Sequence, residues 1–373
     1  MELDEIRKLI DEVDGEMLPL LEKRLRLAQE VAEYKRLHGG GVLRPERERE
    51  VLDKAVSMLQ DSGNALYAEQ FMRAVMDISK DLQRVRLMRP QPAIERAPLD
   101  KSGRVGFFGD EGSFTESAAI GYFGEDSVRV PCDTFAGVFK LVQSGAVKYG
   151  VVPIENSSTG AISEVYDLLG QYNFFIIGEK WVRVRQQLAG IAGAGIDDVR
   201  EVYSHPQGLK QCADFFGNYP GIRLIPYHNT AQSAAYVALC GDKSKAAVCS
   251  ERAAKMNNLE IIRRDINTQS DNYTRFIVIS PTMCDGECDK LSVTFTLGNR
   301  SGTLYNALRY LSVYNVNMTR LESRPQKNNP GNYVFYVDIS GDMRQAELAL
   351  ALLKDSCLSY KLLGEYKKDV IEE

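Results

Sequence analysis

Residues 271–280 read DNYTRFIVIS, and their apolar half identifies a central strand of the fold. Phe276 to Ile279 form a short apolar run that is typical of a buried strand. Thr274 and Arg275 stand just before it, where a plain fold would need only a turn. A polar pair at the entrance of a rigid strand raises the question of what it does there.

Composition excludes several classes of function. The chain has 373 residues, with 46 Lys and Arg against 51 Asp and Glu, a net charge of −5 that gives no footprint for nucleic acid or an anionic membrane. No apolar run approaches the roughly 20 residues of a membrane span. The charged N-terminus and seven dispersed cysteines predict a cytoplasmic protein with reduced thiols. With three histidines, we expect no metal site.

Two breaks in composition divide the chain, whose length suits two or three domains. Residues 89–103 contain three prolines, which is typical of a linker, and residues 281–290 form a shorter, acidic break. We therefore predict domains at 1–89, 102–281 and 290–373, with a linker at 90–101.

The first segment is predicted to be all α-helical. Apolar residues recur at three- and four-residue steps from Ile6 to Val31, which predicts a helix of about 34 residues, or about 50 Å. Pro19 should kink it without breaking it, because Gly15 stands four residues back. Two further helices are expected at about 45–60 and 65–89. A rod of this length cannot bury its apolar stripe within its own segment, so we expect partner helices from a second subunit.

The other two segments mix strands and helices. Strands at 104–109, 149–154, 202–206 and 275–280 alternate with helical patterns, which predicts an α/β fold with a mainly parallel sheet, or two such lobes. The third segment has the order strand, helix, strand, strand, helix, strand, which predicts a ferredoxin-like βαββαβ unit.

Several helical positions could bind a small dianion. Arg24 and Lys35 share nearly one helical face, and Ser79 and Gln83 are one turn apart on the third helix. Cations and an amide pointing into a bundle suit carboxylates. The ordinary alternative for each is a solvated salt bridge or an extended side chain at the surface.

Four polar stretches of the second segment each precede a helix, at 109–119, 152–164, 203–208 and 228–235. Each can be a simple N-cap or a carboxylate site at a helix N-terminus. Several such loops at strand ends favour a ligand in a cleft. His205 is expected to be structural, because nothing spaces it as part of a triad. The candidate binding residues are Ser113, Thr115, Ser157, Ser204, Asn229 and Thr230.

The first segment resembles the all-helical chorismate mutases, through IRKLIDEVDGEMLPLLEKRLRLAQEVAEYK, REREVL and SKDLQ. In this family dimers share their sites, and the first arginine comes from across the interface. Arg44 stands where the family usually has an aspartate that contacts a hydroxyl. The resemblance implies that the two substrate carboxylates are bound by Arg7, Arg24 and Arg47, with support from Ser79. The ether oxygen would be bound by Lys35 and Gln83, and the hydroxyl by Glu48.

The second segment resembles prephenate dehydratase, through VGFFGDEGSFTESAA, VVPIENSSTGAISEVYDLL, YSHPQGLKQC and NYTRF. The resemblance implies two α/β lobes, like those of periplasmic binding proteins, with the site in the cleft. The reaction converts prephenate to phenylpyruvate with loss of CO₂ and a hydroxyl, without a cofactor. Thr274 would be the main catalytic residue. Its polar partners would be Glu155, Asn156 and Gln207, and Arg275 would bind a carboxylate or lock the neighbouring loop.

The third segment resembles the ACT regulatory domain of bacterial dehydratases, through NRSGTLYNAL (299–308) and TRLESRPQ (319–326). Such domains bind phenylalanine between subunits. The usual Gly-Ala-Leu-Val is here Gly302 to Tyr305, with Thr and Tyr substituted. A capping turn and a strand exit are the ordinary reading of these stretches. The resemblance implies that the effector is bound by Gly302, Thr303, Leu304, Glu322, Ser323 and Arg324.

The three resemblances follow one another along most of the chain. Together they predict a bifunctional chorismate mutase–prephenate dehydratase that is inhibited by L-phenylalanine and forms a homodimer or a higher homo-oligomer. Two alternatives remain open at this point. One is a monofunctional prephenate dehydratase whose helical domain serves only dimerisation, and the other is a non-catalytic binding or sensor protein.

Overall fold

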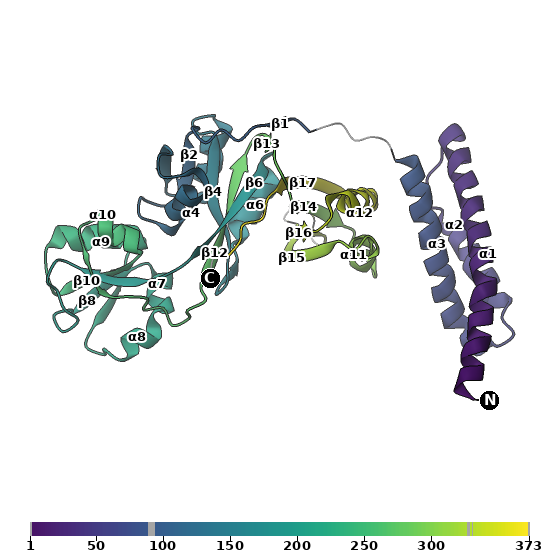
Figure 1. The fold of residues 1–373 in the computed structure, drawn as a ribbon, viewed down its shortest axis with the longest axis horizontal. Coiled ribbons are helices and arrows are strands. Elements are labelled where there is room, and N and C mark those ends of the chain that lie inside the picture. The colour runs from purple at the N-terminus through teal and green to yellow at the C-terminus, as the bar shows by residue number, and fades with distance from the viewer. Residues whose placement is uncertain (1, 89–93, 327–328, 330, 372–373) are drawn as a thin grey trace. The chain divides into compact units, whose positions relative to one another are not determined.

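The computed structural model describes residues 2–88, 94–326, 329 and 331–371 (Figure 1). Contacts divide the chain into two units. One lies within Met1–Ala93 and takes in Leu348–Ser356, and the other comprises Ile94–Glu347 and Cys357–Glu373.

The first unit is helical, as predicted. Helix α1 (Leu3–His38) runs for 36 residues through Pro19, and α3 (Ala65–Leu87) packs against both α1 and α2 (Pro45–Ser57). A short 3₁₀ turn (Ser62–Asn64) precedes α3. The expected end of the third helix, at residue 89, lies outside the described residues.

The apolar stripe of α1 remains exposed within one chain. Ala28 and Ala32 are buried on the side of the helix that faces its own unit. Leu21 and Leu25 are half-buried, but most other apolar residues of α1 are at least 41% exposed, which is more apolar surface than a soluble monomer usually presents to water. They include Ile6, Leu9, Ile10, Val13, Met17, Leu20, Leu27 and Val31.

Two sheets build the middle of the chain, which settles the sequence alternative in favour of two lobes. The first has the order β3-β2-β4-β12-β6 and the second β11-β7-β10-β8-β9. The chain leaves the first lobe after β6 (Phe175–Arg183), builds the second, and returns as β12 (Tyr273–Ser280). The remaining strands of the two sheets are β2 (Val105–Phe108), β3 (Arg129–Cys132), β4 (Tyr149–Asn156), β7 (Gln187–Gly190), β8 (Glu201–Ser204), β9 (Arg223–Pro226), β10 (Lys245–Cys249) and β11 (Glu260–Arg263).

The first sheet is mixed, because the strand β12 runs opposite to β2, β3, β4 and β6. Strand β2 is parallel to β3 and β4, but β12 is antiparallel to both β4 and β6, because it enters the sheet from the second lobe. Its N-terminal end therefore lies beside the C-terminal end of β4. A two-residue strand β5 (Gly160–Ala161) also pairs with β4. The helices of the lobes are α4 (Phe114–Phe123), α5 (Phe135–Gln143), α6 (Ser163–Gln171), α7 (Pro206–Gln211), α8 (Ala213–Gly217), α9 (Thr230–Cys240) and α10 (Glu251–Met256).

The C-terminal segment has the predicted βαββαβ order. Its four antiparallel strands lie in the order β15-β16-β14-β17. The elements are β14 (Lys290–Leu297), α11 (Thr303–Val313), β15 (Asn317–Pro325), β16 (Tyr333–Ser340), α12 (Met343–Ser356) and β17 (Ser359–Tyr366).

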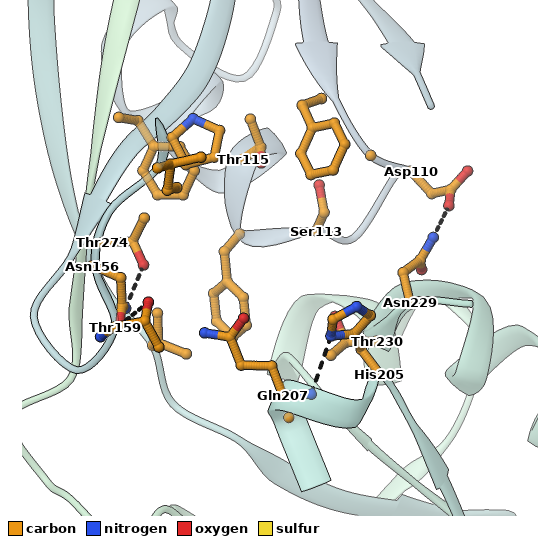
Figure 2. A pocket seen from close by; sticks show the side chains of 18 of the residues that line it. Asp110, Ser113, Thr115, Asn156, Thr159, His205, Gln207, Asn229, Thr230 and Thr274 are labelled. Atoms are coloured by element: carbon orange, nitrogen blue, oxygen red, sulfur yellow. Dashed lines mark hydrogen bonds between the residues drawn. The ribbon is translucent and has the colours of Figure 1, made fainter. Parts of the chain in front are cut away.

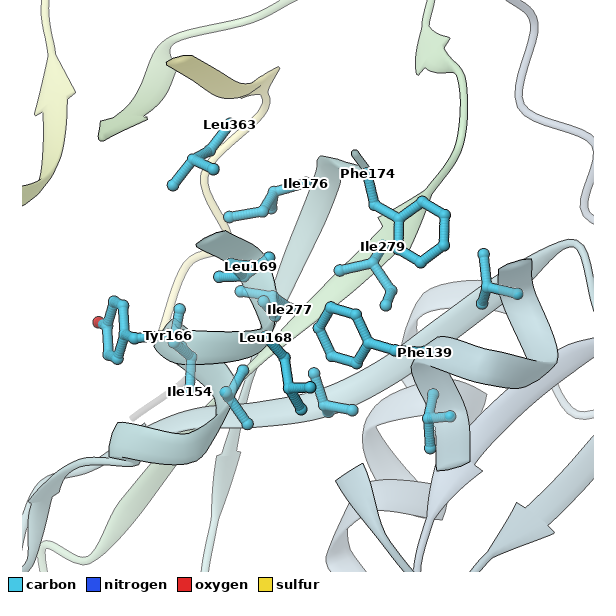
Figure 3. Close-up of a cluster of buried hydrophobic side chains, with 14 of the residues drawn as sticks. Phe139, Ile154, Tyr166, Leu168, Leu169, Phe174, Ile176, Ile277, Ile279 and Leu363 are labelled. Carbon is cyan, nitrogen blue, oxygen red and sulfur yellow. The ribbon is translucent and has the colours of Figure 1, made fainter. Parts of the chain in front are cut away.

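The C-terminal sheet shares a hydrophobic core with the first lobe. Leu363 of β17 packs in one cluster with Ile176, Leu169 and Ile277 of the lobe (Figure 3). Strand β17 also runs against β6. The two breaks in composition, at residues 89–103 and 281–290, also contact each other in the structure. Residues 96–97 of the expected linker form β1 (Arg96–Ala97), which pairs with β13 (Met283–Cys284), whereas residues 90–93 lie outside the described part of the chain.

Gly364 allows this close approach, which gives a first prediction. A Cβ at this position would lie 2.0 Å from the backbone oxygen of Ile176. Gly364→Ala should therefore lower the free energy of unfolding by about 1–3 kcal/mol, the usual cost of overpacking. Chemical denaturation measures this change. Gly217→Ala is the control, because a Cβ there meets nothing within 4 Å, and an equal loss in both variants would contradict the prediction.

Candidate active sites

A cavity of about 800 Å³ lies between the two lobes and receives side chains from both (Figure 2). Among its described lining residues none is Lys or Arg. Seven of the predicted site residues line it: Ser113, Thr115, Asn156, Gln207, Asn229, Thr230 and Thr274.

Thr274 and Asn156 form the polar centre of the first-lobe wall. They face each other across the β12–β4 pair, and Asn156 Nδ2 donates to Thr274 Oγ1 at 2.9 Å (Figure 2). The amide orientation is fixed, because Asn156 Oδ1 accepts from the backbone N–H of Ser158 at 2.9 Å. The Thr274 hydroxyl thus acts as an acceptor within the protein. Among the described hydrogen bonds none uses its hydrogen, which leaves the hydrogen available to a ligand.

The next pair along the same two strands points the other way. Arg275 is opposite Glu155, and neither lines the cavity. Successive side chains of a strand point to opposite faces of the sheet, so a strand that aims Thr274 at the cleft must aim Arg275 away from it. Arg275 is 2% exposed and forms ion pairs with Glu155, Glu179 and Asp338. Substrate contact, which was expected of Glu155 and was one of the two roles left open for Arg275, therefore does not agree with this structure.

Helix N-termini form much of the remaining wall. Ser113 caps α4 by accepting from Glu116 N at 3.2 Å, and Asn229 caps α9 by accepting from Gln232 N at 2.8 Å. His205 lines the cavity and caps α7, since its Nδ1 accepts from Gln207 N at 3.2 Å, in line with the structural role expected of it. Partial positive charge at these helix ends can attract a carboxylate without a cation.

Two predicted binding residues lie outside the cavity lining and hold the scaffold instead. Ser204 is fully buried, and its hydroxyl donates to Val248 O at 2.7 Å. Ser157 Oγ accepts from Tyr273 N at 2.9 Å and so ties down the start of β12. Both predictions were wrong because a serine near a strand end can serve the backbone as readily as a ligand.

Sequence reasoning missed other lining residues, including Phe108, Asp133, Phe135, Thr159 and Asp110. Asp110 is the most informative, since it accepts from Gln232 Nε2 at 2.9 Å and from Asn229 Nδ2 at 2.5 Å, joining the lobes (Figure 2). Its place directly after the predicted strand at 104–109, which ends in a glycine, was the signal available in the sequence. In the structure Gly109 has a φ of 93°.

The helical unit gathers four predicted residues on α1 and α3. Lys35 Nζ donates to Gln83 Oε1 at 2.9 Å, and both side chains are buried. Arg24 donates to Ser79 and to Val75 O, the latter at 3.1 Å. Burial lowers the pKa of Lys35, and the nearby positive charge of Arg44 lowers it further.

The other predicted residues of this unit do not join that group in one chain. Arg7 pairs with Asp4 at 3.2 Å, and Arg47 pairs with Glu50 at 2.7 Å, all four being exposed. Glu48 forms an ion pair with Lys80 at 3.1 Å. One chain therefore assembles a partial site.

The C-terminal segment has a smaller cavity of about 300 Å³, lined by predicted residues Gly302, Thr303 and Leu304 and by Tyr305. The other predicted stretch lies on β15 and does not line it. There Arg324 pairs with Asp167 at 3.2 Å, Ser323 is exposed, and Glu322 lies 3.8 Å from Arg320. One chain does not bring the two stretches together.

Neither a metal cluster nor a membrane span occurs among the described residues. No group of three or more His, Cys, Asp or Glu side chains there could hold a metal ion. No helix in the described part of the chain is long and apolar enough to cross a membrane.

Comparison with known proteins identifies the family. Residues 6–84 match the family Chorismate mutase type II, and residues 105–284 match Prephenate dehydratase. A bifunctional chorismate mutase/prephenate dehydratase of Aquifex aeolicus (strain VF5) is 33% identical over 376 positions, covering 100% of this chain and 99% of that protein. The chain belongs to the bifunctional chorismate mutase/prephenate dehydratases. It rearranges chorismate to prephenate and converts prephenate to phenylpyruvate, which excludes the monofunctional and non-catalytic alternatives.

Two solved structures are similar to the greater part of the chain. Prephenate dehydratase of Arthrobacter aurescens, in complex with L-Phe, is 28% identical with a TM-score of 0.65, covering 71% of this chain and 89% of that one. A protein described as GqqA, a novel type of quorum quenching acylase, is 30% identical with a TM-score of 0.65, covering 71% of this chain and 98% of that one.

Arg44 gives a prediction for the mutase site. Its positive charge disfavours the ammonium of Lys35, so Arg44→Asp should raise the pKa of Lys35. Lys35 would then keep its proton to higher pH, and the alkaline fall of mutase kcat/KM should move upward. Arg26→Asp, an equal charge change at an exposed position of α1, is the control. An unchanged alkaline limb in Arg44→Asp, or an equal shift in both variants, would contradict this.

Proposed function

We propose that Thr274 donates a hydrogen bond to the departing hydroxyl of prephenate in the cavity between the lobes. The bond from Asn156 Nδ2 to Thr274 Oγ1, 2.9 Å long, carries this proposal, because it directs the free hydroxyl hydrogen toward the substrate. Prephenate loses CO₂ and takes up one proton as its hydroxyl departs as water. A threonine hydroxyl is too weak an acid to supply that proton, so its role is to stabilise charge on the departing oxygen.

Helix dipoles hold the substrate carboxylates in this proposal. A full cation beside the carboxylate that leaves would stabilise the ground state and slow decarboxylation. The described lining has no Lys or Arg and instead offers the N-termini of α4 and α9. The amides of Asn229 and Gln232 engage the Asp110 carboxylate, which limits its repulsion of the substrate.

The mutase reaction needs no nucleophile, because the rearrangement is concerted. Arg24 with Ser79 would hold a carboxylate, and Lys35 with Gln83 would stabilise charge on the ether oxygen. Arg47 and Glu48 would bind a carboxylate and the hydroxyl once substrate draws them in. Arg7 would come from a second chain. The exposed apolar stripe of α1 supports a dimer along this helix.

The C-terminal segment would be a ferredoxin-like ACT domain that binds L-phenylalanine and inhibits the dehydratase step. Its βαββαβ order and the cavity at Gly302 to Leu304 support this, as does the L-Phe complex of the related dehydratase. Glu322, Ser323 and Arg324 would complete the site from the other subunit. We also propose that the enzyme works in the cytoplasm.

One assay tests these roles together: conversion of chorismate to phenylpyruvate, with and without phenylalanine. We expect prephenate and then phenylpyruvate to form, with the second step slowed by phenylalanine. A rate of the second step that is unchanged at saturating phenylalanine would remove the regulatory proposal. A mutase rate that is unchanged when Arg7 is replaced by alanine would contradict the proposal that two subunits share the mutase site.

Thr274→Ala should reduce dehydratase kcat about 100-fold or more, the usual loss when an aligned donor to developing charge is removed. Thr274→Ser keeps the hydroxyl and should retain much more activity. Mutase activity of the same chain should be unchanged and serves as the control. Full dehydratase activity in Thr274→Ala would contradict the proposed role.

A further inference from the structure

Six charged side chains, four of them buried and two half-buried, form a cluster between the first-lobe sheet and the C-terminal sheet. Three come from the lobe and three from the C-terminal sheet, and the charges balance at three positive and three negative. The lobe contributes Glu155, Glu179 and Arg275, and the C-terminal sheet contributes Lys290, Arg320 and Asp338.

Arg275 is the centre of the cluster. Its Nε lies 2.8 Å from Glu155 Oε1, and its Nη1 lies 3.2 Å from Glu179 Oε2. The same Nη1 donates to Asp338 of β16, across the boundary between the two sheets. A single guanidinium thus connects two strands of the lobe with the C-terminal sheet.

The C-terminal sheet holds its side of the cluster in a defined geometry. Ser292 donates to Asp338 Oδ1 at 2.6 Å, and Lys290 Nζ lies 2.7 Å from Glu179 Oε2. Arg320 of β15 contacts Glu155. Burial alone would raise the pKa of Asp338, but the charges of Arg275 and Lys290 outweigh burial and lower it, so Asp338 is ionised at neutral pH.

Stability alone is a weak explanation for this cluster. Removing six charges from water is costly, and well-packed apolar side chains of similar volume often stabilise a protein as well or better. The same boundary already has apolar packing through Leu363 and Tyr366. Ion pairs between fixed charges also set the orientation of the strands that carry them, because their geometry is more directional than apolar packing.

What the cluster can orient is the catalytic pair. Arg275 directly follows Thr274 in the chain, and Glu155 directly precedes Asn156. The Thr274–Asn156 pair and the Arg275–Glu155 pair are therefore neighbouring pairs of the β12–β4 ladder. The ladder register shifts just beyond Arg275, between Arg275 and Phe276, so regular pairing alone does not fix the rungs. A displacement of Arg275 is therefore transmitted to Thr274, and a displacement of Glu155 to Asn156, in each case through one peptide unit.

We propose that Asp338 and Arg320 of the C-terminal sheet are positioning residues for the dehydratase reaction. Asp338 holds Arg275, Arg320 holds Glu155, and this pair aims Thr274 and Asn156 into the cavity from the opposite face of the sheet. The inference rests on the proposed role of Thr274. Neither residue lines the cavity, so each acts only through the pair it holds.

The test compares Asp338→Asn and Arg320→Gln with Glu365→Gln in the full-length enzyme. Glu365 forms an ion pair with Arg96, joining the C-terminal sheet to the strand β1, and it is absent from both the cluster and the cavity lining. Dehydratase kcat and KM, thermal unfolding and mutase activity are measured for each variant. Asp338→Asn should lower kcat about 10- to 100-fold, as small misplacements of a reacting group do, while KM stays within about twofold.

A merely structural cluster gives a different result. Asp338→Asn and Glu365→Gln would then both lower the unfolding temperature, and kcat of the folded protein would match that of wild type, which would overturn the inference. If Asp338→Asn does not fold, Arg320→Gln decides, because Arg320 is 20% exposed and its loss leaves Asp338 paired with Arg275. Wild-type kcat in a folded Arg320→Gln would then overturn the inference.

Thr274→Ala in the same series separates the two proposals. If Thr274→Ala is inactive while Asp338→Asn and Arg320→Gln have normal kcat, the proposed function stands and the positioning role is removed. If Thr274→Ala retains full activity, the proposed function itself fails.

Discussion

The antiparallel insertion of β12 between β4 and β6 is the constraint on which the dehydratase part depends. Because β12 enters from the second lobe, its first residues lie beside the last residues of β4, at the edge where the lobes meet. Alternation of side chains then divides function between the two faces. Thr274 and Asn156 face the cavity, while Arg275 and Glu155 face the C-terminal sheet.

Sequence reasoning identified the strand, the threonine that lines the cavity and the capping loops, because each leaves a local pattern. Phe276 to Ile279 are buried as the apolar run indicated, and Ser113 and Asn229 cap helices that border the cavity. The direction of a strand within its sheet leaves no such pattern, because the alternation of apolar and polar residues is the same in a parallel and an antiparallel strand. The partners of Arg275 were also hidden, because Asp338 is 63 residues away in sequence.

The errors share a physical cause. Ser157, Ser204 and Glu155 have the residue types that bind ligands, but the same groups satisfy backbone donors, backbone acceptors and buried cations. Only the fold decides which use prevails. In the helical unit, the resemblance implied that Lys35 and Gln83 act together, and they meet at 2.9 Å, whereas residues expected to act across a subunit boundary cannot be placed from one chain.

The contact of β17 with β6 bears on how such enzymes can be assembled from parts. Gly364 brings the C-terminal sheet against the backbone of Ile176, and Leu363 completes a core that the lobe leaves open. A gene fusion or deletion within residues 281–290 would therefore cut through one packed body, leaving apolar surface and buried charges uncovered on the lobe. Exchange of the C-terminal segment between relatives should succeed only when β6 of the recipient lobe fits the incoming β17, so the lobe and the C-terminal segment are expected to be inherited as one unit.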